Sequence, residues 1–216
     1  MRTSAILMTM TLLLTAGTAF GADLLMQWSL DEGSGTTAGD GSGNGRDGSI
    51  SGAVWSSPGY DGTGYCLDFD GADDTVTDAD AENYLNGLDA ITVSIWVNSD
   101  VTGTDAGFLD TEDPDGKDDT LGIRYDADGW GGDGTEVIKV AISTTGGQLD
   151  LESSSYAQVT DWQHIAVTWS SGNQLALFID GVEDTPTYNE AAVSGTVNNV
   201  EKLLLGMCAK DSSSAW

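Results

Sequence analysis

Apolar and polar residues alternate with a period of two over many short segments of this chain. In residues 91–98 every odd position is Ile or Val, whereas the even positions are Thr, Ser, Trp and Asn. Successive side chains of a β-strand point to opposite faces, so this pattern predicts a strand with one face in a core.

A second pair of alternating segments predicts a hairpin. Residues 161–169 and 174–179 both alternate, and a short Ser/Gly/Asn turn separates them. Asp180-Gly181 follows, and this dipeptide favours a tight turn in which both residues have positive φ. We therefore expect two paired strands and a further reversal of the chain at Asp180.

Strands dominate the rest of the chain as well, because no long stretch has helical periodicity. Gly, Asp, Ser and Asn separate the apolar segments, which is typical of many short strands joined by turns. The pattern predicts an all-β fold, a two-sheet antiparallel β-sandwich with jelly-roll connections. Further strands are expected at residues 24–30, 49–55, 64–70, 107–111, 120–125, 136–143, 148–151 and 202–208, and one helical turn at 81–85.

The first residues have the composition of a secretory signal. Arg2 precedes an apolar run at residues 5–15, and Ala19 and Gly21 place small residues before a cleavage point after Gly21. We therefore expect a signal peptide at residues 1–21 and a single domain at 22–216. A buried first helix is the alternative. The run is too short to span a bilayer, and no other segment is long and apolar enough, so we expect a secreted or cell-surface protein without membrane insertion of its mature chain.

The charge balance excludes some partners. The chain has 35 acidic residues against 7 Lys and Arg, for a formal net charge of −28. Such a surface repels nucleic acid and anionic membranes, and it attracts divalent cations and basic partners. Many of the acids lie in Gly-rich turns, so solubility is the simpler explanation for them.

Several motifs resemble laminin-G-like, concanavalin A-like jelly-roll domains of secreted bacterial proteins, which are related to pentraxins. The matching segments are the hairpin at 161–181 and residues 28–37, 40–48, 66–76 and 88–97. The resemblance covers nearly all of residues 24–208 and implies the same sandwich. Such domains usually end with a strand like Gly-x-Ile-Asp, and this chain stops at Trp216 before it. We therefore expect the final strand to be missing, which would leave an open sheet edge.

Calcium is the cofactor that the acidic loops suggest, since Ca²⁺ prefers carboxylate and carbonyl oxygens on loops. The resemblance implies a site near the first strand, which would include Asp31 and the loop at 40–47. The acid-rich turn at 70–74 is a second candidate. Turn chemistry alone also explains Asp in such loops. The candidate metal ligands are Asp31, Asp40, Asn44, Asp70, Asp73 and Asp74.

A loop tryptophan is the best candidate for ligand contact. Trp130 lies between glycines outside any strand pattern, with Asp128 and Tyr125 close in sequence. Aromatic faces stack on sugar rings, and a neighbouring acid can accept hydrogen bonds from sugar hydroxyls. The alternative is that the loop folds Trp130 back to cover the sandwich.

Catalysis is not expected. Glucanases of this fold carry paired carboxylates, and the nearest pair here, Asp110 and Glu112, is nonspecific in so acidic a chain. His164 is the single histidine and lies within a strand, where a structural role is expected.

The two cysteines, Cys66 and Cys208, are expected to form a disulfide in an exported chain. Two separate buried thiols are the alternative.

The sequence thus favours a non-catalytic extracellular recognition module that binds carbohydrate or a protein surface, with calcium as its cofactor. The alternative is a structural or adhesive spacer of a larger cell-surface protein. A glycoside hydrolase of the same fold is the third hypothesis.

Overall fold

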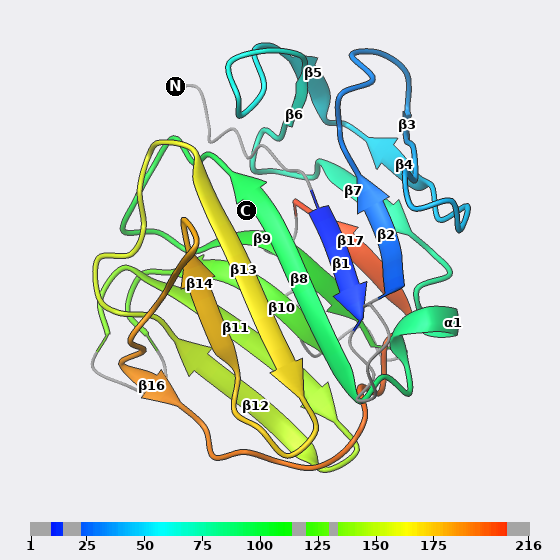
Figure 1. The fold of residues 1–216 in the computed structure, drawn as a ribbon. Helices are drawn as coiled ribbons and strands as arrows, with labels where there is room; N and C mark the ends of the chain where they lie inside the picture. Colours follow the sequence, from blue (N-terminus) through cyan, green and yellow to red (C-terminus); the bar gives the residue numbers. More distant parts are fainter. Residues whose placement is uncertain (1–9, 15–22, 114–119, 130–133, 207–216) are drawn as a thin grey trace.

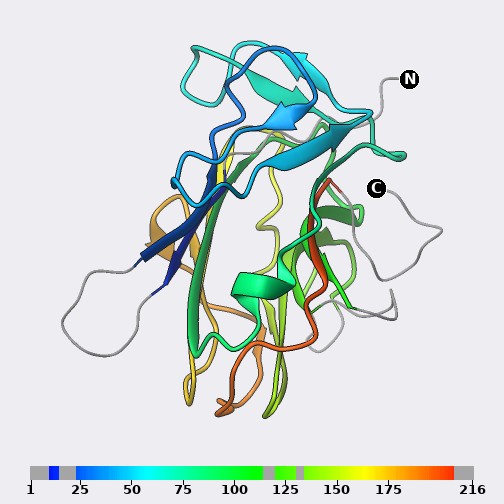
Figure 2. The same cartoon turned by 90° about the vertical axis from the view of Figure 1, so that its right-hand side faces the viewer.

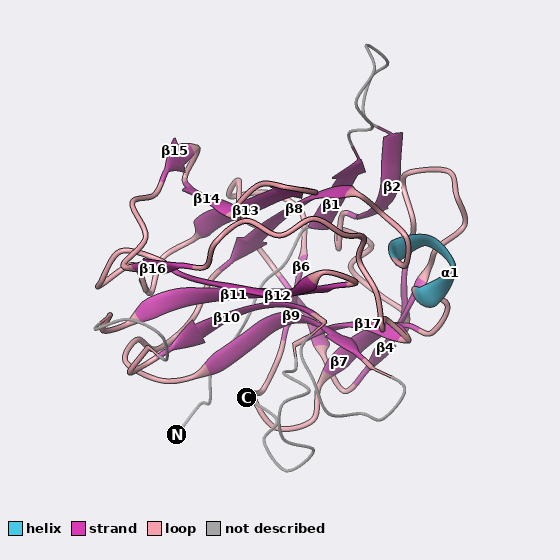
Figure 3. Ribbon diagram, turned by 90° about the horizontal axis from the view of Figure 1, so that it is seen from below, coloured by secondary structure: helices cyan, strands magenta, loops and turns pink. Residues whose placement is uncertain are grey.

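A computed structural model describes residues 10–14, 23–113, 120–129 and 134–206 of the protein. These residues form two antiparallel sheets that face each other, and the one helix among them is the short α1 (Glu82–Leu85) at one end (Figures 1, 2 and 3). The predicted two-sheet jelly-roll sandwich and the helical turn at 81–85 are therefore confirmed.

The first sheet has six strands in the order β15-β14-β13-β8-β1-β2. Every neighbouring pair in it is antiparallel. Its outer face is turned toward the viewer in Figure 1. The strands are β1 (Met10–Leu14), β2 (Asp23–Trp28), β8 (Ala90–Val97), β13 (Gln163–Ser170), β14 (Ala176–Ile179) and β15 (Val182–Glu183).

The second sheet has nine strands in the order β16-β12-β11-β10-β9-β17-β7-β4-β3. A separate two-stranded sheet, β5 (Val54–Ser56) with β6 (Cys66–Asp68), lies at the top of Figure 1. The nine strands are β3 (Thr37–Ala38), β4 (Gly48–Ser51), β7 (Thr75–Asp78), β9 (Ala106–Glu112), β10 (Leu121–Asp126), β11 (Val137–Thr144), β12 (Gly147–Glu152), β16 (Tyr188–Asn189) and β17 (Lys202–Leu205).

The core lies between the two sheets and follows from the alternation seen in the sequence. Ile91, Val93, Ile95 and Val97 of β8 are buried, whereas the residues between them are partly exposed. The same division holds along β13, where every second residue from Gln163 is buried. Strict alternation therefore leaves the even-numbered side chains of β8 on the outer face of the six-stranded sheet.

The turn predicted at Asp180-Gly181 joins β14 to β15. Asp180 has a φ of 50° and Gly181 a φ of 78°, and Ile179 pairs with Val182 across the turn. Positive φ at both central positions is what a two-residue hairpin of this kind needs, so this prediction is confirmed.

The N-terminal segment that resembles a signal peptide contributes a strand. Met10–Leu14 forms β1 and lies between β8 and β2 in the sheet. The rest of residues 1–21 falls outside the described residues, and cleavage after Gly21 stays a prediction. Within the described parts of the chain, no helix has the length and hydropathy needed to cross a membrane.

Candidate functional site

A cluster of aromatic rings lies at one end of the outer face of the six-stranded sheet. The ring of Tyr60 stacks on that of Trp96, with centroids 4.7 Å apart and an interplanar angle of 21°. Trp162 meets Tyr60 edge to face at 6.3 Å. On its other side Trp96 lies against His164, with centroids 5.1 Å apart. Four rings from three segments of the chain thus form one continuous aromatic surface.

Two neighbouring strands and one loop position these rings. Trp96 of β8 stands directly opposite His164 of β13 in the register. Their neighbours Ile95 and Ile165 are buried, so alternation turns Trp96 and His164 outward. Tyr60 comes from the loop between β5 and β6, where the Gly59 amide donates to the Thr63 carbonyl at 2.8 Å and closes a tight turn.

Next to the ring of Tyr60 is a cavity of about 250 Å³. Tyr60 and Tyr65 are 45% and 47% exposed, so their rings are accessible from solvent. The lining combines these rings with an amide, hydroxyls and carboxylates. The lining residues are Gln27, Ser29, Asp31, Gly59, Tyr60, Asp61, Thr63, Gly64 and Tyr65. We call this cavity, together with the adjoining rings of Trp96, Trp162 and His164, the Tyr60 cleft.

Both carboxylates of the Tyr60 cleft are fixed by hydrogen bonds from the main chain. Asp31 Oδ1 accepts from the Tyr65 amide at 2.6 Å. Asp61 Oδ1 accepts from the Thr63 hydroxyl at 2.7 Å and the Thr63 amide at 2.8 Å. The Thr63 hydroxyl, and then its amide, lower the pKa of Asp61. Asp61 therefore stays charged at neutral pH, and the hydrogen bonds hold both carboxylates in fixed positions.

A glycine allows this close packing. Gly64 has a φ of +60°, and a Cβ placed on it would lie 2.2 Å from Asp31 Oδ1. A larger residue would therefore clash with the Asp31 carboxylate and be strained in its backbone.

His164 is bound within the sheet, as its strand position suggested. Its Nε2 lies 2.7 Å from Ser94 Oγ, and its main-chain amide donates to Asp180 Oδ1 at 2.9 Å. Burial lowers the pKa of His164, and the Asp180 carboxylate partly opposes this. The imidazole is therefore mainly neutral at pH 7, and it supports the edge of Trp96.

The ligand contacts predicted from the sequence lie elsewhere. The predicted ligand contact of Tyr125 is wrong, because its side chain is completely buried. It packs edge to face on Phe108 at 4.7 Å, and its hydroxyl lies 3.0 Å from Gln163 Oε1. Asp128 is exposed beyond the end of β10, and Trp130 lies outside the described residues. The signal for the Tyr60 cleft was present in residues 58–65, where two tyrosines stand among glycines.

Hydrogen bonds to Asp40 hold the loop at 40–47 together. Asp40 Oδ1 accepts from the amides of Gln27 and Ser42 at 3.0 and 2.9 Å. Oδ2 accepts from the Ser42 hydroxyl at 2.8 Å and the Arg46 amide at 3.0 Å. Four donors occupy the four lone-pair positions of this carboxylate. Burial raises the pKa of Asp40, but the amides of Arg46, Ser42 and Gln27 outweigh it and lower the value to about 2.

The other polar side chains of this loop are engaged in the same way. Asp47 Oδ1 accepts from the Asp40 amide at 2.8 Å. Asn44 Nδ2 donates to the carbonyls of Leu24 and Leu25, both at 2.9 Å. The loop therefore binds its own main chain and the edge of β2, and these residues do not fit a calcium ion.

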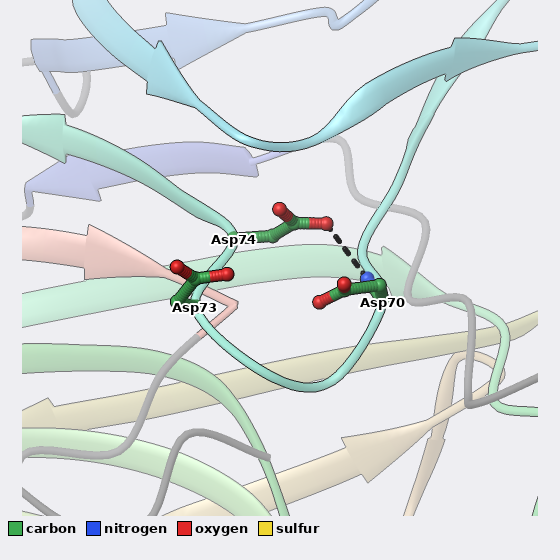
Figure 4. Close-up of side chains that lie close together, drawn as sticks. All are labelled: Asp70, Asp73 and Asp74. Atoms are coloured by element: carbon green, nitrogen blue, oxygen red, sulfur yellow. Dashed lines mark hydrogen bonds between the residues drawn. The ribbon is translucent and has the colours of Figure 1, made fainter.

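The acid-rich turn between β6 and β7 brings three carboxylates together (Figure 4). One oxygen from each of Asp70, Asp73 and Asp74 lies within 4.8 Å of the others. Asp74 Oδ2 accepts from the Asp70 amide at 2.7 Å. Asp74 is buried, and this burial, together with its two acidic neighbours, raises its pKa despite the Asp70 amide. Calcium binding at this turn stays a prediction.

Replacing Asp74 with asparagine should stabilise the protein above about pH 4. The folded state prefers the protonated form of Asp74, so its charge costs free energy as pH rises from the ordinary pKa of 3.8 through the raised value. The asparagine oxygen can still accept from the Asp70 amide. We expect a gain in the free energy of unfolding at pH 7 and none at pH 3, measured by urea denaturation.

Asp128→Asn is the matched control, because that acid is exposed. Repeating the pair of measurements with calcium tests the metal prediction: an ion on this turn would raise the melting temperature of the native protein more than that of Asp74→Asn. A gain at pH 3 equal to that at pH 7 would contradict the electrostatic explanation.

Cys66 is buried, and its Sγ donates to the Ser56 carbonyl at 3.2 Å. Burial raises the pKa of this thiol to about 11, so it stays protonated and poorly reactive. Cys208 lies outside the described residues, and its pairing with Cys66 stays a prediction.

The two carboxylates considered as a hydrolytic pair, Asp110 and Glu112, have structural roles. Asp110 is completely buried in β9, and its Oδ1 accepts from the Thr111 amide at 2.7 Å. Glu112 forms an ion pair with Lys202 of the neighbouring strand β17. A buried acid and a paired acid do not flank an accessible glycosidic bond.

The fold resembles solved binding domains of a mosquitocidal protein and of botulinum neurotoxins. The binding domain of Paraclostridial mosquitocidal protein 1 is 14% identical with a TM-score of 0.56, over 94% of this chain and 46% of its own. The botulinum neurotoxin serotype D/C binding domain is 11% identical with a TM-score of 0.50, over 96% of this chain and 45% of its own. The botulinum neurotoxin DC binding domain in complex with rat synaptotagmin II is 12% identical with a TM-score of 0.51, over 84% of this chain and 43% of its own. The chain spans less than half of each, and at these identities the likeness shows the fold alone.

Sequence comparison identifies the family. No curated protein matches the chain. A family model of the laminin-G type matches residues 70–212, more than half of the 216 residues. The match includes β8, β13 and the predicted hairpin, which agrees with the resemblance found in the motifs. The chain therefore belongs to the concanavalin A-like lectin/glucanases superfamily.

Proposed function

We propose that this domain is a non-catalytic extracellular recognition module that binds a neutral carbohydrate in the Tyr60 cleft. The observation that carries the proposal is the exposed ring of Tyr60, stacked on Trp96 beside a cavity with fixed polar groups. Aromatic rings offer a flat apolar surface to the C–H face of a sugar, and a few convergent polar groups orient the ligand.

The polar groups of the cleft suit sugar hydroxyls. Asp31 and Asp61 are charged acceptors, and the Gln27 amide and Thr63 hydroxyl supply both donors and acceptors. Hydrogen bonds to charged groups are stronger than those between neutral groups. Two fixed carboxylates in a chain of net charge −28 also repel anionic ligands. The proposed ligand is therefore a neutral sugar rather than an acidic one.

The structural neighbours support a binding role in general terms. All three are described as binding domains, and one of them is in complex with rat synaptotagmin II. These descriptions concern those proteins and leave a protein surface as the competing partner for this one. The Tyr60 cleft favours carbohydrate, because its polar groups line a small cavity and not a broad apolar patch.

The test is affinity electrophoresis of the protein against a panel of neutral and acidic polysaccharides, with calcium and with chelator. Tyr60→Ala should weaken binding about tenfold, as expected for loss of one stacking ring worth about 1–2 kcal/mol. Tyr60→Phe should bind nearly as well as the native protein, since the stacking face is kept.

Tyr156→Ala is the matched control, because Tyr156 is 72% exposed and is absent from the cleft lining. Equal weakening in the Tyr60 and Tyr156 variants would place the ligand elsewhere. A folded protein that no polysaccharide retards would refute the carbohydrate proposal and favour a protein partner or a spacer role.

A further inference from the structure

A second cavity lies beside β15, the strand that ends the six-stranded sheet (Figure 3). Its volume is about 310 Å³, and it shares no lining residue with the cavity of the Tyr60 cleft. Its lining is drawn from two segments of the chain, residues 154–163 after β12 and residues 179–184 around β15. We call it the Val182 cavity.

Val182 has the register of a core residue but not its burial. Ile165 of β13 stands opposite Ile179 of β14, and Ile179 stands opposite Val182 of β15. Residues directly opposite each other in a sheet share a face, so all three lie on the face where Ile165 is completely buried. Ile179 is only partly buried, and Val182 is 71% exposed. The apolar inner face of the sheet therefore reaches solvent at this edge.

Tyr156 adds a second exposed apolar surface to the same cavity. It is 72% exposed, and it and Val182 are the two most exposed large hydrophobic residues among those that the structure describes. Its φ of 62° is uncommon for an aromatic residue. Two main-chain hydrogen bonds hold this conformation, from the Tyr156 amide to the Thr135 carbonyl at 2.8 Å and from the Ala157 amide to the Glu136 carbonyl at 3.1 Å. The fold thus holds an aromatic residue at the cavity without burying it.

The charges of the Val182 cavity are negative. Glu183 and Asp184 line it, and its lining contains no Lys or Arg. Asp184 is held by Ser154, whose hydroxyl donates to Oδ1 at 2.6 Å and whose amide donates to Oδ2 at 2.8 Å. Between Lys139 and Lys202 the sequence has eight acidic residues and no Lys or Arg. Charge complementarity therefore favours a basic partner and disfavours an anionic membrane or a second copy of this chain, whose net charge is −28.

The edge of β15 suits a polypeptide. Glu183 stands opposite Phe178, and the following amide, that of Asp184, donates to the Leu177 carbonyl at 2.9 Å. Successive residues of an antiparallel pair turn their main-chain groups alternately toward the partner and away from it. The N–H and C=O of Glu183 therefore point away from β14, on the side where no described strand follows. An extended segment can bond to them while one of its side chains enters the cavity.

We infer that the Val182 cavity and the edge of β15 form a docking site for an extended polypeptide segment that carries an apolar residue next to Lys or Arg. The apolar side chain covers Val182 and Tyr156, and the basic side chain lies against Glu183 and Asp184. The site is separate from the Tyr60 cleft, so the domain can hold a protein partner and a carbohydrate together. The inference does not depend on the proposed carbohydrate binding.

The experiment selects short random peptides displayed on phage for binding to the full chain. Prior passage over the Val182→Ser protein removes peptides that bind elsewhere, including those that bind the Tyr60 cleft. We expect the selected peptides to carry Leu, Ile, Val or Phe directly beside Lys or Arg. The most enriched peptide is then synthesised with a fluorescent label, and its Kd for the native chain is measured by fluorescence anisotropy.

Two variants test the two parts of the site. Tyr156→Asn removes the ring, and Asn tolerates positive φ, so the Kd should rise about tenfold. Glu183→Lys should raise it by a similar factor, and a peptide with Gln in place of its basic residue should not distinguish Glu183→Lys from the native chain. Val54→Ser is the matched control, because Val54 is 59% exposed and lines neither cavity. All three positions are exposed, so each variant should stay folded in a thermal melt.

Several results would overturn the inference. One is a selection that yields no peptide dependent on Val182, and another is enrichment of acidic rather than basic residues. Binding to neutral phosphatidylcholine vesicles that is lost in Val182→Ser would assign the cavity to a lipid surface instead. A dimer that is lost in the same variant would assign it to a second copy. Carbohydrate binding measured on Tyr156→Asn should stay native, which separates this site from the Tyr60 cleft.

Discussion

Replacing Asp40 with alanine is expected to lower the free energy of unfolding by about 3 kcal/mol at pH 7. The variant leaves the amides of Gln27, Ser42 and Arg46 without their acceptor. A hydrogen bond to a charged group contributes about 1.5–3 kcal/mol, and water recovers part of this at a partly exposed site. Urea denaturation at pH 7 measures the loss, with Asp128→Ala as the exposed control.

The stabilisation by Asp40 should disappear at acid pH. Its pKa is about 2 in the folded protein against an ordinary value of 3.8. A carboxylate with a lowered pKa stabilises the fold above its ordinary pKa, and this contribution fades as pH falls toward the folded value. The difference between native protein and Asp40→Ala should therefore shrink between about pH 4 and pH 2. A difference that stays constant over this range would show that the loop is held by something other than this charge.

The consequences of losing Asp40 should reach beyond its own loop. The Arg46 carbonyl accepts from Trp28 Nε1 at 2.8 Å, and the Arg46 guanidinium lies 3.8 Å above the ring of Tyr84. Tyr84 in turn donates to Asp78 Oδ2 at 2.6 Å. The loop thus connects β2, α1 and β7, and its release should increase amide exchange at Gln27 as well as at Ser42.

The same loop shows where inference from sequence stops. Asp40-Gly-Ser-Gly-Asn-Gly is equally compatible with cation ligation and with a turn in which Asp accepts main-chain amides. The choice depends on whether Gln27, thirteen residues earlier, presents its amide to Asp40. That contact is set by the packing of β2, which no local pattern contains.

The strands could be predicted because alternation is a local pattern. The Tyr60 cleft could not be predicted, because it depends on contacts between residues far apart in the sequence. Residues 91–98 and β8 (Ala90–Val97) agree to within one residue, since each position needs only its own polarity to choose a face. Tyr60 lies in a turn without periodicity, and its stacking on Trp96 joins residues 36 positions apart. The prediction of a ligand contact for Tyr125 fails for a related reason. It rests on closeness in sequence to a loop tryptophan, whereas the alternation of β10 places the Tyr125 side chain in the core.

Trp96→Ala is expected to weaken carbohydrate binding about 100-fold, corresponding to about 3 kcal/mol, typical of a central aromatic residue in an interface. Trp96 contacts Tyr60 on one side and His164 on the other. Its removal takes away one aromatic surface and also the support that holds the ring of Tyr60. The effect should therefore exceed that of Tyr60→Ala, where Trp96 stays in place.

A folding defect would mimic this loss, so the control must be another partly buried tryptophan. Trp55 fits, because its Nε1 donates to the Gly35 carbonyl at 2.9 Å. It belongs neither to the cavity lining nor to the stacked rings of Tyr60, Trp96, Trp162 and His164. Trp96 lies on the outer face of the sheet, so both alanine variants should remain folded in a thermal melt. Binding measured by isothermal titration should fall only for Trp96→Ala. Equal losses for the two variants would move the ligand away from the Tyr60 cleft, because only Trp96 supports its aromatic surface.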